Sequence, residues 1–324
     1  MDIPEEMINS ISEYQLTILT IDGVRGLAIG SDESGEAPAY HVFVADAAAP
    51  PPGLPETLAG FPVVVQADYQ VLTATDSARY EPARGGSEIS RVVNIGEGGA
   101  QYNSGTLGMI VDDAFVGTES GPVLQGLSCA HVMSPPVDLP QNEPERNRIQ
   151  QPAPSTFPPP SKQFLGVLLR ESVPSIPLTG TQLIGPCDAA ICQLDRPASR
   201  GSILEIGSTA GILATPTKEL PVRKRGRTTG LTNGVIKQLH GSFLIYNRDG
   251  TPRWWLSDQI RIEGIDPDTG KPMEFSREGD SGSIVVDKAN RVVGMLVSGN
   301  PSDFISGIVT PAATLQLNLG IVFP

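Results

Sequence analysis

The stretch Gly279-Asp280-Ser281-Gly282-Ser283 decides how the rest of this chain is interpreted. Glycine, aspartate and serine favour tight turns, because glycine adopts backbone conformations that other residues avoid. A serine at such a turn can supply an attacking hydroxyl, while the backbone N–H groups of Gly279 and Ser281 can form an oxyanion hole. An ordinary polar turn has the same composition, so the functional interpretation needs partners elsewhere in the sequence.

A serine hydroxyl is a poor nucleophile at neutral pH and needs a general base, for which the chain has three histidines. His131 lies in the segment Gly126–Val132, which is typical of a short apolar strand that presents a histidine at its end. His41 falls in an alternating segment and His240 in a polar one, and we predict structural roles for both. His131 is therefore the candidate base.

The base in turn needs a carboxylate that orients its imidazole. Asp188 enters the apolar segment Ala189–Leu194 and is the candidate for this role. The chain order is His131, Asp188, Ser281, with separations of 57 and 93 residues. These separations suit two β-barrels, with the first two residues on one barrel and the serine on the other. Each residue alone has an ordinary structural explanation, but the three in this order predict a catalytic triad.

The composition favours short strands and turns over long helices, since the 324 residues include 35 glycines and 30 prolines. The net charge of −13 argues against a nucleic-acid ligand, because binding to phosphates depends on basic side chains. The sequence contains no apolar stretch of about 18 residues, so we expect no membrane-spanning helix. The acidic N-terminus lacks the features of a secretion signal. We expect a cytoplasmic protein with no membrane or nucleic-acid partner.

Three cysteines, Cys129, Cys187 and Cys192, do not form an even disulfide framework and indicate reduced thiols. Cys129 and Cys187 stand beside the candidate base and its carboxylate, so a redox-sensitive pair is one alternative to the expected inert thiols. No spacing of cysteine and histidine typical of zinc sites is present. We expect neither a metal nor another cofactor.

The segment before the candidate triad predicts a small α+β N-terminal domain with a linker over residues 1–98. Within it we expect a helix from Pro4, strands at 24–30, 40–44 and 61–66, a helical turn at 54–60 and the linker at 75–98. Residues 99–324 then form the domain that carries the candidate triad.

Two further segments leave alternatives open, and a third predicts a turn. Residues 133–161 are rich in proline and predict a surface excursion, which either shapes a cleft or is simply a permissive loop. The basic segment Arg223–Arg227 fits an anion site or, as we prefer, a solvated strand edge. Asn233-Gly234 is typical of a hairpin turn.

Together the motifs resemble those of the chymotrypsin-like serine proteases, in which the fold is mainly β and consists of two β-barrels. Further segments look like one branch, the intracellular trypsin-like proteins related to the plant NARROW LEAF proteins, which has many bacterial members. The N-terminal segment also resembles that branch, so the resemblance covers most of the chain. The segments that carry it are 105–108, 127–131, 226–232, 258–260 and 279–283. Cys129-Ala130 departs from the polar pair expected before the histidine.

The resemblance implies a serine endopeptidase that acts through an acyl-enzyme on a protein or peptide substrate. His131 would be the base, Asp188 its orienting carboxylate and Ser281 the nucleophile. Asp280 is expected to find an internal partner, so that no activating cleavage is needed. The alternative is a catalytically silent or latent scaffold or binding protein on the same fold, for which a homo-oligomer through the N-terminal domain is one arrangement.

The resemblance also implies substrate-binding residues. Val297, Ser298 and Gly299 would form the strand that pairs with the substrate backbone. Phe275, six residues before the serine, would be the floor of the primary specificity pocket. A phenylalanine there favours an apolar or small substrate side chain over arginine or lysine.

Overall fold

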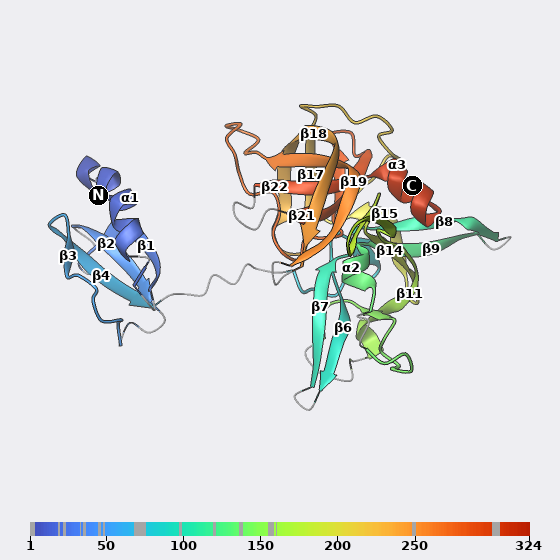
Figure 1. The fold of residues 1–324 in the computed structure, drawn as a ribbon, viewed down its shortest axis with the longest axis horizontal. Coiled ribbons are helices and arrows are strands. Elements are labelled where there is room, and N and C mark those ends of the chain that lie inside the picture. The colour runs from blue at the N-terminus through green and yellow to red at the C-terminus, as the bar shows by residue number, and fades with distance from the viewer. Residues whose placement is uncertain are drawn as a thin grey trace. The chain divides into compact units, whose positions relative to one another are not determined.

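The computed structural model divides the chain into two compact units, Met1–Leu72 and Thr73–Pro324 (Figure 1). It describes residues 4–324 apart from 19, 22–23, 33, 35–36, 45–46, 48, 68–75, 97–98, 119–120, 136–138, 155–158, 160, 248–250 and 300–304. The boundary lies earlier than the predicted one at residue 98. The reason is that β5 (Ala83–Gly85) and β6 (Glu88–Gly96) are strands of the second unit's sheets.

The first unit is a small α+β fold. Helix α1 (Glu5–Ile18) packs on a four-stranded sheet of order β1-β2-β4-β3. The strands are β1 (Val24–Ser31), β2 (Pro38–Val44), β3 (Thr57–Leu58) and β4 (Phe61–Ala67). Met7, Ile18, Tyr40 and Val42 are buried together in its core. The helical turn predicted at 54–60 is wrong, because Thr57 and Leu58 pair with β4 instead.

The first large sheet of the second unit has eight strands, in the order β23-β8-β9-β14-β11-β10-β6-β7. Besides β6, its strands are β7 (Gly99–Thr106), β8 (Met109–Thr118), β9 (Gly121–Ser128), β10 (Arg148–Gln150), β11 (Phe164–Ser172), β14 (Ala189–Leu194) and β23 (Ile321–Val322). The one-turn helix α2 (Ala130–Met133) follows β9 directly. A 3-10 turn, Ser161–Gln163, leads into β11.

The second large sheet also has eight strands, in the order β12-β13-β19-β18-β17-β20-β21-β22. An additional pairing of β19 with β22 closes the last six of these strands on one another, as a barrel requires. The strands are β12 (Ile176–Thr179), β13 (Gln182–Gly185), β17 (Pro221–Gly226), β18 (Gly230–Tyr246), β19 (Pro252–Gly264), β20 (Ile284–Asp287), β21 (Val292–Gly299) and β22 (Ser306–Pro311).

A three-stranded sheet of order β16-β15-β5 and the helix α3 (Ala312–Leu319) complete the unit. The strands β15 (Ala198–Ile203) and β16 (Gly207–Ser208) lie in the connection between the two large sheets. The fold is therefore mainly β after a small α+β unit, as predicted, and its two eight-stranded sheets are consistent with the predicted double β-barrel. Among the described residues, no helix is long and apolar enough to cross a membrane.

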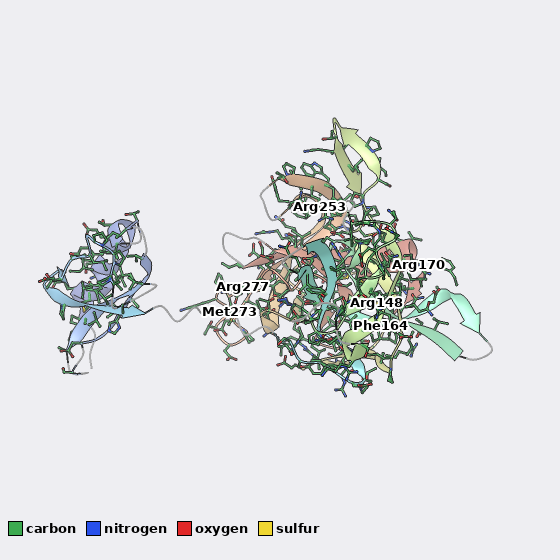
Figure 2. All side chains as sticks on the ribbon, turned by 90° about the horizontal axis from the view of Figure 1, so that it is seen from below. Arg148, Phe164, Arg170, Arg253, Met273 and Arg277 are labelled. Atoms are coloured by element: carbon green, nitrogen blue, oxygen red, sulfur yellow. The ribbon has the colours of Figure 1, made fainter. Side chains whose placement is uncertain are left out.

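Two local predictions fail for reasons of pairing. The proline-rich segment 133–161 is not wholly a surface excursion, because β10 lies inside the first sheet and Ile149 is buried there. Arg148 also stacks on β11, with its guanidinium carbon 4.2 Å from the centroid of the Phe164 ring (Figure 2). Asn233-Gly234 is not a hairpin turn, since both residues pair with β17 inside the long strand β18.

Candidate active site

The sheet register brings His131 and Asp188 together. Strands β9 and β14 pair antiparallel, with Ser128 opposite Ala190, so that the residues just after β9 and just before β14 meet at one edge. His131 Nδ1 lies 2.7 Å from Asp188 Oδ2, and the backbone N–H of His131 donates to Asp188 Oδ1 at 2.9 Å. Both carboxylate oxygens are thus committed to one histidine, which fixes the imidazole.

The environment of Asp188 keeps it ionised. Its side chain is fully buried, and burial raises the pKa of Asp188, but the charge of His131 and the hydrogen bonds from it outweigh burial. The net effect places the pKa of this carboxyl below its ordinary value, and the positive charge of Arg253 adds to that effect. The ionised carboxylate accepts the hydrogen bonds that hold the His131 ring in place.

Ser281 stands on a turn that requires glycine on both sides. Gly279 has φ +97° and Gly282 has φ +98°, a region that residues with a Cβ avoid. A Cβ on Gly282 would also lie 2.2 Å from the Thr106 carbonyl oxygen. The N–H of Thr106 donates to the Ser281 carbonyl at 2.9 Å. The end of strand β7 on the first barrel therefore positions the serine of the second.

The peptide between Glu278 and Gly279 is held in one orientation. Thr228 Oγ1 donates to the Glu278 carbonyl at 2.8 Å, and in a trans peptide the following N–H points the opposite way. Thr106 Oγ1 donates to the Gly279 carbonyl at 2.9 Å. Within the described part of the chain, the N–H groups of Gly279 and Ser281 have no hydrogen-bond acceptor. Two backbone donors are thus left for a ligand.

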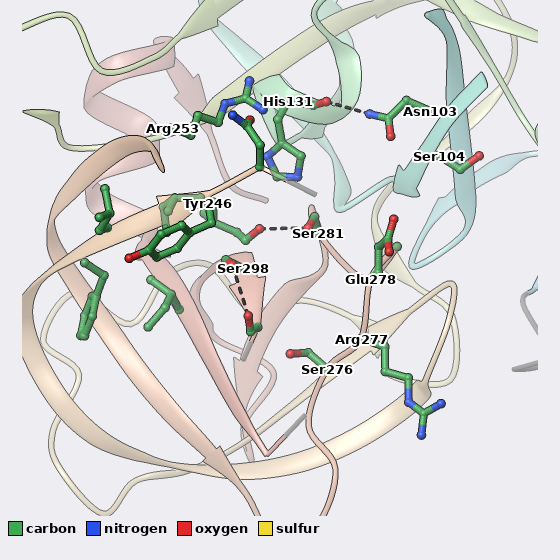
Figure 3. Close-up of a pocket in the computed structure, with 18 of the residues that line it drawn as sticks. Asn103, Ser104, His131, Tyr246, Arg253, Ser276, Arg277, Glu278, Ser281 and Ser298 are labelled. Carbon is green, nitrogen blue, oxygen red and sulfur yellow. Dashed lines mark hydrogen bonds between the residues drawn. The ribbon is translucent and has the colours of Figure 1, made fainter. Parts of the chain in front are cut away.

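His131, Gly279 and Ser281 line one cavity of about 1020 Å³ (Figure 3). The Ser281 hydroxyl donates at 2.9 Å to the Val297 carbonyl rather than to the imidazole. Hydrogen bonds between a nucleophile and its base are often long or absent in a free enzyme and tighten only when substrate is bound. Val297, Ser298 and Gly299 line the same cavity.

The prediction that Phe275 forms the floor of the specificity pocket is wrong. The side chain is fully buried in the core of the second barrel, packed with Ile236 and Ile262, and it does not line the cavity. The next residue, Ser276, lines it instead, together with Ser306. The predicted position lies one residue from the cavity lining. Adjacent residues of an extended chain point to opposite sides, so Ser276 faces the cavity while the Phe275 side chain faces the core.

Asp280 has the internal partner that we expected. Lys224 Nζ lies 3.3 Å from Asp280 Oδ2, and both side chains are fully buried. The other donors to this carboxylate are the N–H groups of Thr228, Thr229 and Arg277 and the hydroxyl of Thr229. Burial lowers the pKa of Lys224, and the charge of Asp280 opposes that shift.

The basic segment Arg223–Arg227 is neither an anion site nor a solvated edge. Lys224 is committed to Asp280, and Arg225 contacts the carboxylates of Asp76 and Glu205. Arg227 pairs with Glu88 at 3.1 Å. Lys224, Arg225 and Arg227 are therefore in ion pairs, one of which holds the turn of Ser281, while Arg223 donates to Asn290 Oδ1 at 2.6 Å.

The roles of several residues of the site cannot be predicted from the sequence alone. Thr106 and Thr228 belong to segments that carry the family resemblance, and the structure shows that they orient the turn around Gly279. Asn103 Nδ2 donates to the His131 carbonyl at 2.8 Å. Arg91 and Arg253 line the cavity and come from strands distant in sequence. The described residues contain no group of three His, Cys, Asp or Glu side chains that could hold a metal ion.

No family model and no curated protein matches the chain. Among solved structures it is similar to Cellulomonas bogoriensis chymotrypsin, at 16% identity and a TM-score of 0.45 over 75% of this chain and 98% of that one. It is similar to the Nocardiopsis protease NAPase, at 15% identity and 0.46 over 74% and 98%. It is also similar to Thermobifida fusca protease A, at 13% identity and 0.46 over 74% and 97%. These structural neighbours are serine proteases of the chymotrypsin-like class.

Proposed function

We propose that this protein is a serine endopeptidase in which Ser281 is the nucleophile, His131 the general base and Asp188 the carboxylate that orients it. The observation that carries the proposal is the bidentate contact of Asp188 with His131, which lines the same cavity as Ser281 and two backbone N–H groups that have no acceptor among the described residues. A structural ion pair would explain the first feature but would leave the two N–H donors without a use.

In the proposed reaction, the Ser281 oxygen attacks the carbonyl carbon of the scissile peptide while His131 Nε2 takes the hydroxyl proton. The N–H groups of Gly279 and Ser281 stabilise the resulting oxyanion. The C–N bond then breaks, the amine leaves with the proton from His131, and an acyl-enzyme remains. Water, activated by the same imidazole, releases the acid. Loss of one oxyanion donor typically costs about 10²–10³ in kcat.

The substrate backbone would lie along Val297–Gly299, where main-chain hydrogen bonds supply alignment. A substrate N–H directed at the Val297 carbonyl would compete with the Ser281 hydroxyl for that acceptor. Substrate binding itself would then favour the rotation of Ser281 toward His131. Ser276 and Ser306 give the neighbouring pocket a small and polar lining.

The finer assignments also remain proposals. We propose the branch of intracellular trypsin-like proteins on the segments that resemble it, and a reducing compartment on the three free, buried cysteines. A silent scaffold on this fold is the second candidate. The observation in its favour is the present hydrogen bond of the Ser281 hydroxyl to Val297.

The test is labelling of the full chain with a fluorophosphonate, followed by intact-mass measurement. We expect one adduct on the parent and none on Ser281→Ala. Ser298→Ala is the matched control, because Ser298 lines the same cavity and, among the described residues, its hydroxyl donates only to the neighbouring Gly299 carbonyl at 3.4 Å. A folded parent that takes no adduct, or an adduct that persists in Ser281→Ala, would favour the scaffold.

A further inference from the structure

Two arginines line the active-site cavity on the His131 side, and neither is paired with a carboxylate of the described residues. Arg91 comes from β6 and Arg253 from β19. Figure 3 shows Arg253 next to His131, whereas Ser276 and Arg277 lie at the other end of the cleft, beyond Ser281. Among the residues that the structure describes, no Asp or Glu forms an ion pair with either guanidinium.

Arg91 is buried, with 7% of its surface exposed. A buried charge without a counter-charge lowers the stability of the folded protein. Among the described residues, the guanidinium of Arg91 makes only long hydrogen bonds of 3.4 Å to the carbonyls of Val92 and His131, and its Nε has no partner there. Burial is the larger cause and the like charge of Arg253 the second, and together they lower the pKa of Arg91 to about 10. The two cations therefore destabilise each other in the absence of an anion.

Two other arginines near this site, Arg277 and Arg227, are already paired with carboxylates. The Nε of Arg277 contacts the carboxylate of Glu274, and Arg227 pairs with Glu88. Among the described residues, the acidic groups that act on Arg91 and Arg253 at longer range are Glu171 and Asp188, and Asp188 is committed to His131. Glu278 lines the cavity as well, and the stretch Ser276–Glu278 lies away from Arg253 in Figure 3.

We infer that Arg91 and Arg253 form a subsite for an anionic side chain of the substrate, a carboxylate or a phosphate, bound beside His131 and next to the residue that enters the serine-lined pocket. Guanidinium groups bind both anions through paired N–H donors. The chain carries a net charge of −13, which repels acidic peptides in general, so a local cationic subsite is what admits them.

This inference rests on the proposed peptidase function for the identity of its ligand, but its test does not need catalysis. The protein is the full chain carrying Ser281→Ala, which binds without turnover. The probes are fluorescent twelve-residue peptides of neutral sequence in which one position after another carries Glu, Gln, Lys or phosphoserine. Fluorescence anisotropy at low salt gives the dissociation constants.

We expect Glu to bind about tenfold more tightly than Gln at one or two adjacent positions, the size of a hydrogen-bonded charge pair. Arg253→Gln should abolish that preference, and Arg253→Glu should transfer it to Lys. Arg261→Gln is the matched control, because Arg261 lies on the same strand, is not among the cavity-lining residues and pairs with Glu263 at 2.9 Å. It should leave the preference intact.

Phosphoserine at the preferred position distinguishes the two anions, since tighter binding than Glu assigns the subsite to phosphate and weaker binding to carboxylate. Equal affinity for Glu and Gln at every position would overturn the inference, as would a preference that survives Arg253→Gln or a failure of every peptide to bind. Circular dichroism and thermal melting show that each variant is folded.

Fluorophosphonate labelling separates the two proposals. A protein that is labelled and cleaves the Gln peptides as fast as the Glu peptides, with no preference in binding, loses the anionic subsite but keeps the peptidase function. A protein that is not labelled but binds Glu peptides through Arg253 loses the peptidase function and keeps the subsite.

Discussion

The Nζ of Lys224 lies 3.3 Å from Oδ2 of Asp280, and neither side chain is exposed to solvent. This pair connects strand β17 to the residue directly before Ser281. Since Asp280 accepts hydrogen bonds from five donors, the turn that carries the serine is fixed from inside the second barrel. The arrangement supports the proposal that the site needs no cleavage elsewhere in the chain to form.

We therefore expect Lys224→Met and Asp280→Asn each to lower the free energy of unfolding by about 3–5 kcal/mol, because each leaves a buried group without its partner. The double variant should lose less than the two single losses combined, since it removes both charges. Urea denaturation of the four proteins measures this coupling. Strict additivity would mean that the pair is not the unit that holds the turn.

Removal of residues 1–72 should leave a folded and active protein. The second unit has its own buried clusters, and the linker residue Asp76 contributes to it by contacting Arg225. We expect residues 73–324 to melt cooperatively and to react with the fluorophosphonate at the parental rate. Removal of residues 1–98 is the contrasting variant. The remaining protein should not fold, because this deletion also removes β5 and β6.

Rates that rise strongly on removal of residues 1–72 would contradict an independent second unit and would indicate that the first unit restrains the site. Loss of folding in the same truncation would show that the boundary is placed wrongly.

Acid should destabilise the protein partly through Asp188. The pKa of Asp188 is lowered in the folded state, so its contribution to stability is complete above the ordinary aspartate pKa of about 4 and is lost as the pH falls through the folded value. Unfolding free energies of the parent, measured from pH 6 downward, should therefore fall more steeply below about pH 4 than those of Asp188→Asn. Parallel curves would show that Asp188 is not specially stabilised as a carboxylate.

The three thiols should be inert in the native protein. Cys129, Cys187 and Cys192 are free and fully buried. Burial raises the pKa of all three, that of Cys192 to about 12, so little thiolate forms at neutral pH. Iodoacetamide at pH 8, followed by mass spectrometry, should modify them only after unfolding. Rapid modification of Cys129 or Cys187 in the folded state would instead support the redox-sensitive pair.

The sequence by itself determined the class of fold and the members of the candidate triad. The turn glycines around Ser281 and the strand ends at His131 and Asp188 are local features, in which neighbouring residues impose the backbone that the chemistry needs. The mainly β character follows equally from composition and short apolar segments. Such features are readable because the physical cause and its effect lie within a few residues of each other.

Only the tertiary structure decided the partners. Lys224 looked like part of a surface charge cluster until β17 placed it inside the barrel against Asp280. Phe275 sat at a plausible distance from Ser281, but its side chain packs into the core. Arg91 and Arg253 are 162 positions apart in the sequence and meet at one cleft. Burial and charge pairing are properties of segments that meet in space, and chain order does not encode which segments meet.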